Sequence, residues 1–565
     1  MDFCKTRAHG SRLPGAGRAP LLFLKRERKD HLKKRPIALA AALTLTAGLT
    51  ACNQAAPAPS DNQPQTTSNA PVVVSYGISN PWDSLMPYNS ASGSNYSRMI
   101  YDKIYDRLAY VHADGTLSPR AAKSWESADD GLSVRFFLDE KAAFHDGTPV
   151  TAQHWVDTIL RMTDPECPTL GRSAFSVLAG TDSSGVAVAG ETVGVVAEDD
   201  YTLKLTFKTP TTPEDFLLDR NREYYVLPTH LMEDVAPADT MTMDLWSAPI
   251  GSGPCKFESE VMGSSMVLTA NEDYQLGAPG FDELDITVMD KNSLLTALIA
   301  GDLDYYAIGG SVSANDQPTA ENAGFQVLEG TVPNTFFELM LNNKSIDDAR
   351  IRRAIELALD KELLCEQSTQ GHGTVTGTSV LPTCASYAGD YNVEYNVDAA
   401  KELLAEAGYD GTTYSLACTS NRQGLAALMQ QQLEEAGFSI QVETVDSTTM
   451  FAGMADGTYD MGIASHTPNA LPLWFNESRF NAENNIFRVA DTAPYEERIA
   501  AVKNETDPDK RTAALAELED YLAQERPFIP LWFGTALHVQ SNTVSGIDYP
   551  SASFSNENVW EWVKE

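Results

Sequence analysis

Short apolar runs alternate with longer amphipathic segments in the carboxyl half of the chain. Runs rich in apolar and β-branched residues predict strands, and segments whose apolar residues recur every three or four positions predict helices. In order, they are a strand over 413–418, a helix over 422–435, a strand over 438–445, a helix over 447–454 and a strand over 459–464. Gly437 and Gly457 stand in the short turns between these elements. The alternation predicts an α/β lobe.

The amino half contains a strand pattern followed by a helix pattern. Every second residue is apolar at Leu132, Val134, Phe136 and Leu138, as expected for a strand with one buried face. Asp146-Gly147 is a turn signal, and Thr151 can cap the next helix. One face of that helix should carry Trp155, Val156, Ile159 and Leu160. We interpret this passage as structural.

The amino terminus has the features of a secretion signal. Basic residues at 31–35 precede an apolar segment at 36–49, which is too short for a permanent membrane helix. Leu-Thr-Ala then precedes Cys52, which resembles the lipobox of bacterial lipoproteins and implies that Cys52 is lipidated and becomes the mature amino terminus. The alternative is an ordinary signal peptide in which Cys52 is incidental.

No later segment is long and apolar enough to cross a membrane. We therefore expect an extracytoplasmic protein that is attached to the membrane by its N-terminal lipid only. Residues 52–71, rich in Pro, Ala, Gln, Ser and Thr, predict a flexible tether.

Chain length and net charge limit the classes of protein to which this chain can belong. A chain of 565 residues with 43% hydrophobic residues predicts two or more packed lobes. It carries 41 basic and 78 acidic side chains, and the body after residue 51 carries 30 and 75 of them. Such an acidic body repels phosphate backbones, so we expect no nucleic-acid partner.

Cysteine usage indicates neither zinc nor redox chemistry. Without the leader and Cys52, five cysteines remain and none forms a Cys-x-x-Cys pair. Cys365 and Cys384 flank a Gly-rich loop and are candidates for a disulfide. Buried free thiols are the alternative.

Candidate catalytic and metal-binding residues are better explained by structure. His145-Asp146 lies in a turn and His154 in the first turn of a helix, with no further ligand at metal spacing. Asp302 and Asp304 flank a turn and are expected to cap it. The chain has no nucleophile elbow, P-loop or His-Glu-x-x-His motif. We therefore predict a protein that is not an enzyme and needs no cofactor or bound metal.

A series of sequence motifs runs through the chain. One region reads Pro119-Arg120-Ala121-Ala122-Lys123-Ser124-Trp125, then Phe144-His145-Asp146-Gly147-Thr148-Pro149-Val150-Thr151-Ala152. Further motifs follow at 249–257, 298–304, 342–361 and 399–409. In this order they resemble the motifs of the family 5 extracellular solute-binding proteins. The chain departs from the family pattern at 139–143, a predicted surface turn.

The resemblance implies an α/β, two-lobed periplasmic-binding-protein-like fold of class II with an extra domain. Crossing strands should join the lobes near 287–291 and 531–535, and the protein should be a monomer. The expected parts are a leader with signal peptide (1–51), a tether (52–71), lobe I (72–109, 198–290 and 535–565), its extra domain (110–197) and lobe II (291–534).

The resemblance also implies a function, the substrate-binding subunit of an ABC importer. The protein would capture a short peptide between its lobes and deliver it to the permease and ATPase subunits. In peptide-binding members, an Asp beyond the strand at 459–464 pairs with the ligand's α-ammonium. Counted from Asp460, the equivalent residue here is Asn469, and the aromatic residue three positions earlier becomes His466.

Two further groups complete the expected ligand site. The opposing lobe should contribute Ser92, Gly93, Ser94 and Asn95, whose small side chains let backbone groups approach a ligand, although an ordinary solvated loop has the same composition. Trp474 either stacks on the ligand or fills the core.

Other functions remain open at this point. The same fold could bind a metal chelate or another small molecule, with His466 as a metal contact. A secreted hydrolase lacks a nucleophile–base pair here, and a surface interaction protein is compatible with the fold.

Overall fold

The first lobe is built on a five-stranded sheet in the order β11-β1-β10-β9-β8. The computed structural model describes residues 70–89, 95–112, 114–219, 224–306, 311–481, 484–549 and 558–565. The strands are β1 (Val73–Ile78), β8 (Cys255–Val261), β9 (Ser265–Ala270), β10 (Glu283–Val288) and β11 (Tyr305–Tyr306). β1 runs parallel to β10 and β11. β9 is antiparallel to both β8 and β10. Helix α1 (Asn95–Ile104) contacts this sheet where the Met99 sulfur lies 3.8 Å from the Tyr76 hydroxyl.

A second, antiparallel sheet in the order β4-β5-β7-β6 includes β4 and β5 of the predicted extra domain. Its strands are β4 (Ala122–Ser127), β5 (Ser133–Leu138), β6 (Val195–Asp199) and β7 (Thr202–Thr206). The predicted boundary at residue 197 falls inside β6, which forms one hairpin with β7. The alternation along β5 is confirmed, since Val134, Phe136 and Leu138 are buried.

Helix α2 (Ala152–Thr163) packs against this sheet. Trp155, Val156 and Ile159 are buried as predicted, but Leu160 is 45% exposed. Leu160 lies at the edge of the buried stripe, about 100° around the helix from Ile159. The remaining short elements of this part are β2 (Ala109–Val111), β3 (Leu117–Pro119), η1 (Arg172–Val177), α3 (Pro213–Asp219), η3 (Thr229–Leu231), η4 (Pro237–Thr242) and η5 (Asp244–Ser247).

The second lobe contains a six-stranded mixed sheet in the order β15-β19-β14-β18-β16-β17. Its strands are β14 (Thr335–Leu341), β15 (Gly373–Val375), β16 (Thr413–Cys418), β17 (Ser439–Thr444), β18 (Met461–His466) and β19 (Phe528–Gly534). β16 is parallel to β17 and β18, and β14 is antiparallel to β18 and β19. The strands predicted over 413–418, 438–445 and 459–464 are therefore confirmed as β16, β17 and β18.

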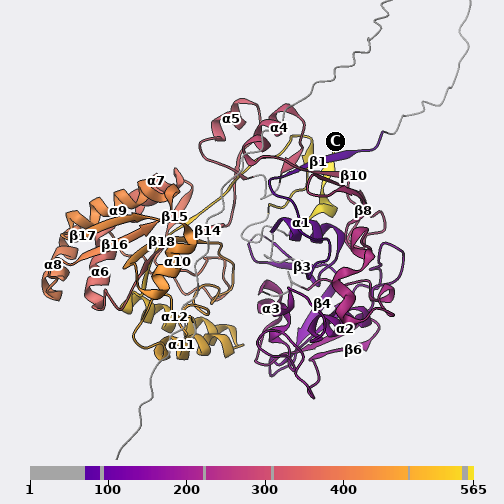
Figure 1. Ribbon diagram of the computed structural model, residues 1–565, viewed down its shortest axis with the longest axis horizontal. Helices are drawn as coiled ribbons and strands as arrows, with labels where there is room; N and C mark the ends of the chain where they lie inside the picture. Colours follow the sequence, from indigo (N-terminus) through magenta and orange to yellow (C-terminus); the bar gives the residue numbers. More distant parts are fainter. Residues whose placement is uncertain are drawn as a thin grey trace, which may run out of the picture. The chain divides into compact units, whose positions relative to one another are not determined.

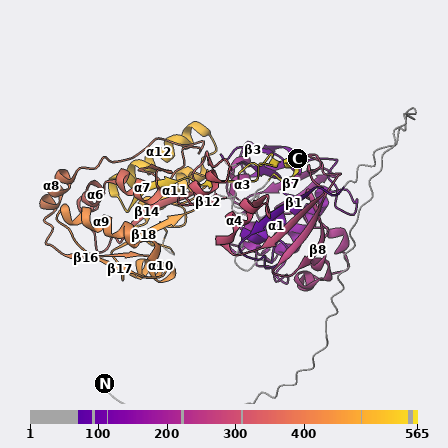
Figure 2. The same cartoon turned by 90° about the horizontal axis from the view of Figure 1, so that it is seen from above.

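Helices cover both faces of this sheet, so its inner strands β14, β18 and β19 are largely buried on both sides. One core contains α6 (Ala349–Ala358), α7 (Lys361–Thr369), α8 (Val397–Ala407) and α9 (Gln423–Glu435). The other contains α10 (Ser447–Asp456), α11 (Ala493–Asn504) and α12 (Pro508–Glu525). Along β14, Phe336 and Met340 enter the second core and Leu339 and Leu341 the first. α11 and α12 lie side by side in both views (Figures 1 and 2).

A small three-stranded sheet lies where the chain passes between the lobes. It pairs β12 (Ser311–Val312), β20 (Leu537–His538) and β13 (Leu328–Glu329), in that order. It shares a core with α4 (Leu294–Ala300), which follows η6 (Lys291–Ser293), and with α5 (Gln317–Asn322). The predicted first crossing at 287–291 is wrong, because β10 and β11 both pair with β1 in the first sheet. The chain enters the second sheet at Thr335 and leaves it at Gly534, close to the predicted second crossing.

Asp304 holds the carboxyl terminus against the first lobe. The Asp304 carboxylate accepts hydrogen bonds from the backbone N–H of Ser75 at 2.8 Å and from Lys564 Nζ at 2.6 Å. Asp304 therefore ties β1 to β22 (Val563–Lys564), and its predicted role as a turn cap is wrong. The C-terminal end lies beside β1 (Figure 1), after β21 (Val544–Ser545) and η8 (Val559–Glu561).

The sequence motifs at 144–152 and 249–257 contact one another. His145 Nδ1 accepts the backbone N–H of Gly251 at 3.1 Å, and its Nε2 donates to the Gly253 carbonyl at 3.1 Å. A Cβ atom on Gly251 would lie 1.9 Å from the Ile104 carbonyl oxygen, so the turn requires glycine. Burial lowers the pKa of His145 to about 4, which keeps Nδ1 unprotonated and able to accept the Gly251 N–H. The structural interpretation of His145 is confirmed.

The cysteines within the described residues are all buried and unpaired. The candidate disulfide between Cys365 and Cys384 is therefore absent, and the alternative of free thiols holds for both. None of the helices in the described ranges has the length and apolar character needed to cross a membrane.

Candidate functional site

A cavity of about 810 Å³ lies between two distant segments of the chain. One segment runs from Ser176 to Asp219 and includes α3, and the other runs from Asn469 to Arg511 and ends on α12. All described residues belong to one compact unit. The cavity thus brings together side chains from both predicted lobes.

The loop after β18 forms one wall of this cavity. β16 and β18 are parallel, so their carboxyl ends lie at the same edge of the sheet, where open α/β sheets usually bind ligands. The structure places Asn469 and Trp474, two of the residues predicted from the sequence, on this wall. Leu471, Pro472 and Leu473 between them also line the cavity.

Asn469 is half-buried, and its side-chain oxygen already has a partner. Oδ1 accepts a hydrogen bond from the backbone N–H of Leu471 at 2.9 Å. This is an Asx turn, in which a side-chain carbonyl replaces a backbone acceptor. The Nδ2 group and the second lone pair of Oδ1 are therefore the parts of Asn469 left for a ligand.

Trp474 is held by the core and is half-buried. Its Nε1 donates to the Ser379 carbonyl at 2.8 Å. Its ring meets Phe336 at 90° and Phe475 at 65°, with centroids 5.8 and 5.4 Å away. The tryptophan therefore packs in the core, as one of the two alternatives predicts, and it also lines the cavity. Its stacking on a ligand stays a prediction.

His466 is the last residue of β18, and it is not among the residues that line the cavity. Its Nδ1 accepts from Arg479 at 3.2 Å, and its Nε2 lies 2.7 Å from the buried carboxylate of Glu338. Because Arg479 can only donate, Nδ1 carries no proton and Nε2 donates to Glu338. Both ring nitrogens are thus engaged, and neither is available to a metal ion in this conformation.

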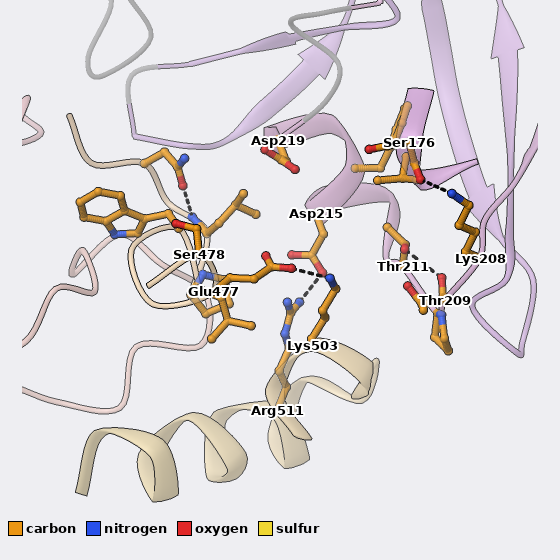
Figure 3. Close-up of a pocket in the computed structure, with 18 of the residues that line it drawn as sticks. Ser176, Lys208, Thr209, Thr211, Asp215, Asp219, Glu477, Ser478, Lys503 and Arg511 are labelled. Atoms are coloured by element: carbon orange, nitrogen blue, oxygen red, sulfur yellow. Dashed lines mark hydrogen bonds and ion pairs between the residues drawn. The ribbon is translucent and has the colours of Figure 1, made fainter. Parts of the chain in front are cut away.

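Charged side chains line the cavity, and the sequence analysis did not identify them. Asp215 on α3 forms an ion pair with Arg511 on α12, and Glu477 forms one with Lys503 on α11. Figure 3 shows the members of each pair pointing toward one another. Lys208 Nζ donates to the backbone carbonyls of Ser176 at 2.6 Å and Asp182 at 3.0 Å.

No local signal marks these charges. Asp215 and Arg511 are separated by 296 positions, and each reads as part of a solvated helix surface. The predicted opposing loop cannot be compared with them, because Ser92, Gly93, Ser94 and the side chain of Asn95 lie outside the described residues.

A second cavity, of about 340 Å³, adjoins the small three-stranded sheet. Its lining is mainly hydroxyl and amide side chains, including Ser313, Asn334 and Thr369, together with His372. Across the described ranges, no group of three or more His, Cys, Asp and Glu side chains could hold a metal ion. Neither cavity therefore presents a ready metal site made of those side chains.

Comparison with known proteins gives a consistent result. The family model described as "Bacterial extracellular solute-binding proteins, family 5 Middle" matches residues 116–486. The oligopeptide-binding protein AppA of Bacillus subtilis (strain 168) is 24% identical over 524 residues, which cover 86% of this chain and 91% of AppA.

Solved structures show the same fold. The ABC transporter substrate-binding protein CtaP from Listeria monocytogenes superposes with a TM-score of 0.73 at 20% identity, covering 87% of this chain and 99% of that one. NikZ from Campylobacter jejuni, determined in complex with Ni(L-His), superposes with a TM-score of 0.66 at 19% identity, covering 87% and 99%. The two-lobed α/β fold predicted from the sequence is thereby confirmed.

Proposed function

Because the chain belongs to the bacterial extracellular solute-binding proteins of family 5, we propose that it captures a short peptide and delivers it to the permease of an ABC importer. The oligopeptide-binding relative supports the choice of ligand. In this proposal the protein acts as a monomer outside the cytoplasm, and the permease and its ATPase subunits are its partners.

The observation that carries the proposal is the cavity lined by both segments. Its volume of about 810 Å³ lies in the usual range of about 300–1,000 Å³ for small-ligand sites. Leu471, Leu473 and Trp474 give it apolar surface, and the paired charges and Asn469 give it polar groups. A short peptide has both kinds of surface.

Identification of the bound ligand tests this proposal. The protein is purified without denaturant, its intact mass is measured under native conditions, and the ligand released on unfolding is sequenced by mass spectrometry. We expect short peptides. Protein that has been unfolded, dialysed and refolded is the control and should carry none. A released metal chelate, or another non-peptide molecule, would contradict the peptide assignment and favour the alternative ligand class.

We further propose that a lipid on Cys52 anchors the protein to the membrane, since Leu49-Thr50-Ala51-Cys52 follows a short apolar segment. Cys52 lies outside the described residues. Cys52→Ser should release the protein into the medium or leave the precursor uncleaved, whereas Cys4→Ser should leave anchoring unchanged. A processed, unmodified Cys52→Ser protein that stays on the membrane would exclude this anchor.

A further inference from the structure

The loop that follows β18 is closed at its base by side chains. Residues 467–478 contain turns but no helix or strand, and they carry Asn469 and Trp474 into the cavity wall. His466 precedes this loop and Arg479 follows it. Arg479 Nη2 donates to His466 Nδ1 at 3.2 Å, so the two ends of the loop are joined.

A buried carboxylate fixes the histidine in this position. Glu338 is fully buried on β14, and His466 Nε2 donates to its Oε1 at 2.7 Å. The other oxygen, Oε2, has no hydrogen-bond partner among the described residues. A buried carboxylate is costly without a donor, so Glu338 holds the imidazole in the tautomer whose Nδ1 can accept from Arg479.

Arg479 also contacts the loop itself. Its Nη1 donates to the Phe475 carbonyl at 2.9 Å, and its Cζ lies 4.1 Å from the centroid of the Phe475 ring. The His466 ring meets the same phenyl ring at 68°, with centroids 5.5 Å apart. Phe475 is fully buried and directly follows Trp474, so the arginine and the histidine hold the residue next to the cavity wall.

We infer that Glu338, His466 and Arg479 (the buried bridge) are positioning residues, which hold the loop after β18 in the conformation that forms the cavity wall. The inference rests on the proposed function in that the ligand enters this cavity. Among the described residues that line the cavity, none belongs to the buried bridge, so the bridge acts through the loop and not by touching the ligand.

The histidine is the member of the bridge with two simultaneous duties. It donates toward Glu338 and accepts from Arg479, which a neutral imidazole or an amide can do and a phenyl ring cannot. Removing the histidine alone would leave a buried carboxylate without its donor, which strongly destabilises a protein. Replacing both members of a buried pair by apolar side chains is often tolerated. The test therefore changes Glu338 and His466 together.

Three variants separate the bridge from the fold. Glu338→Met/His466→Phe removes the bridge without leaving a carboxylate buried. His466→Gln keeps a donor for Glu338 and an acceptor for Arg479. Asp146→Asn/His230→Phe is the control, because it removes another histidine–carboxylate pair, with 2.8 Å between Nε2 and Oδ2, at a place outside the cavity lining. Thermal unfolding establishes that each variant is folded.

Hydrogen–deuterium exchange on the intact protein, stripped of ligand by unfolding and refolding, measures the loop directly. The amides of Leu471, Glu477 and Arg479 donate hydrogen bonds to acceptors in the loop, so peptides that contain them report whether it keeps its conformation. We expect exchange there to be at least tenfold faster in Glu338→Met/His466→Phe. In His466→Gln and in the control it should stay within threefold of the wild type, and β16 should exchange equally in all of them.

Equilibrium dialysis with a pool of mixed-sequence pentapeptides measures the consequence for binding. Glu338→Met/His466→Phe should bind the pool at least tenfold more weakly than the wild type, and His466→Gln should differ less than threefold. If the double variant does not fold, Arg479→Lys takes its place. It keeps the charge and loses the fork that reaches His466 and Phe475 together, so it should show the same two effects.

The outcomes separate this inference from the proposed function. Loop exchange at the wild-type rate without the bridge overturns the inference, and so does faster exchange with unchanged binding. Equal losses in His466→Gln and in the double variant also overturn it, because the amide preserves both hydrogen bonds. Failure of the pool to bind the wild type overturns the peptide assignment, and the exchange rates alone then decide the inference.

Discussion

Glu519 lies on α12, where it is 4% exposed and its Oε1 has no hydrogen-bond partner among the described residues. Burial raises the pKa of this carboxyl to about 7, although Thr378 and Arg526 act in the opposite direction. The folded protein therefore holds a proton on Glu519 at a pH at which the unfolded chain has lost it. Stability from this group is complete below about pH 4.5 and is lost as the pH rises through 7.

Glu519→Gln should consequently raise the unfolding temperature at pH 8 and leave it nearly unchanged at pH 5. The amide keeps the shape of the protonated acid and has no charge to bury. The free energy of unfolding at pH 8 should therefore rise by about 1–3 kcal/mol. Glu517→Gln, at an exposed position of the same helix, is the control. Equal shifts at both pH values would show that Glu519 is not protonated in the folded protein.

The stability contributed by His145 depends on pH in the opposite direction. Burial lowers its pKa to about 4, below the value of 6.5 for a free histidine, so the unfolded chain binds the proton first. Stability from the neutral ring is complete above pH 6.5 and is lost as the pH falls through 4. His145→Gln keeps a donor and an acceptor toward Gly253 and Gly251 but does not titrate. Its unfolding temperature should therefore fall less than that of the wild type between pH 6.5 and 4. Identical pH profiles would contradict this account.

At the residue scale, the sequence predicts a position where a motif supplies one. Counting from Asp460 indicates Asn469, and Trp474 follows from its place beside that segment; both line the cavity. The charges opposite them were not found, because the Asp215–Arg511 pair depends on two helices that only the tertiary fold brings together. The direction of the Asn469 amide was equally hidden, since it depends on the backbone conformation at Leu471.

At the scale of elements, α12 has two functions. Its inner face fills a core with Leu515, Leu518 and Leu522, and its first turns present Arg511 to Asp215 on α3. The two side chains are 12% and 22% exposed, so solvent screens the pair only in part. The ion pair therefore links the two segments that line the cavity.

A double-mutant cycle measures this link. Asp215→Asn and Arg511→Gln should each lower the free energy of unfolding, and the double variant should lose less than the sum of the two. We expect a coupling of about 1 kcal/mol, which should shrink at high salt. Urea denaturation of the four proteins gives the value. A coupling of zero would mean that the pair contributes nothing in solution.

Elements with clear periodicity were predicted well and very short ones were not. β16, α9, β17 and α10 begin and end within one or two residues of the predicted limits, because each has several turns or alternations of pattern. β12, β13 and β20 each have two residues, too few for any period. The sheet that contains them, and the place where the chain changes lobe, had no sequence signal for that reason.

At the scale of the whole molecule, the two lobes share few covalent connections. The chain passes from β11 to β14 and returns from β19 to β21, with the small sheet pairing both passages through β20. Such a connection allows a hinge motion in which ligand binding shifts an existing equilibrium toward a closed form.

Small-angle scattering tests this hinge. The radius of gyration should decrease when the stripped protein is saturated with the ligand released from native material. The unfolded-and-refolded protein without ligand is the reference. An unchanged radius at saturation would exclude closure of the lobes on binding.

The buried thiols have a practical consequence for anyone who handles the protein. Cys167, Cys255, Cys365, Cys384 and Cys418 are each at most 5% exposed, and burial raises the pKa of Cys255 to about 12 and of Cys384 to about 11. A thiol-specific alkylating reagent reacts with the thiolate, so these sulfurs should react only when the structure opens. Cys167 and Cys255 lie in one core, Cys365 and Cys418 in another and Cys384 in a third. The rate at which each cysteine is alkylated, measured on the peptides of a digest, would therefore report how often each core opens. No cysteine has to be introduced for this measurement.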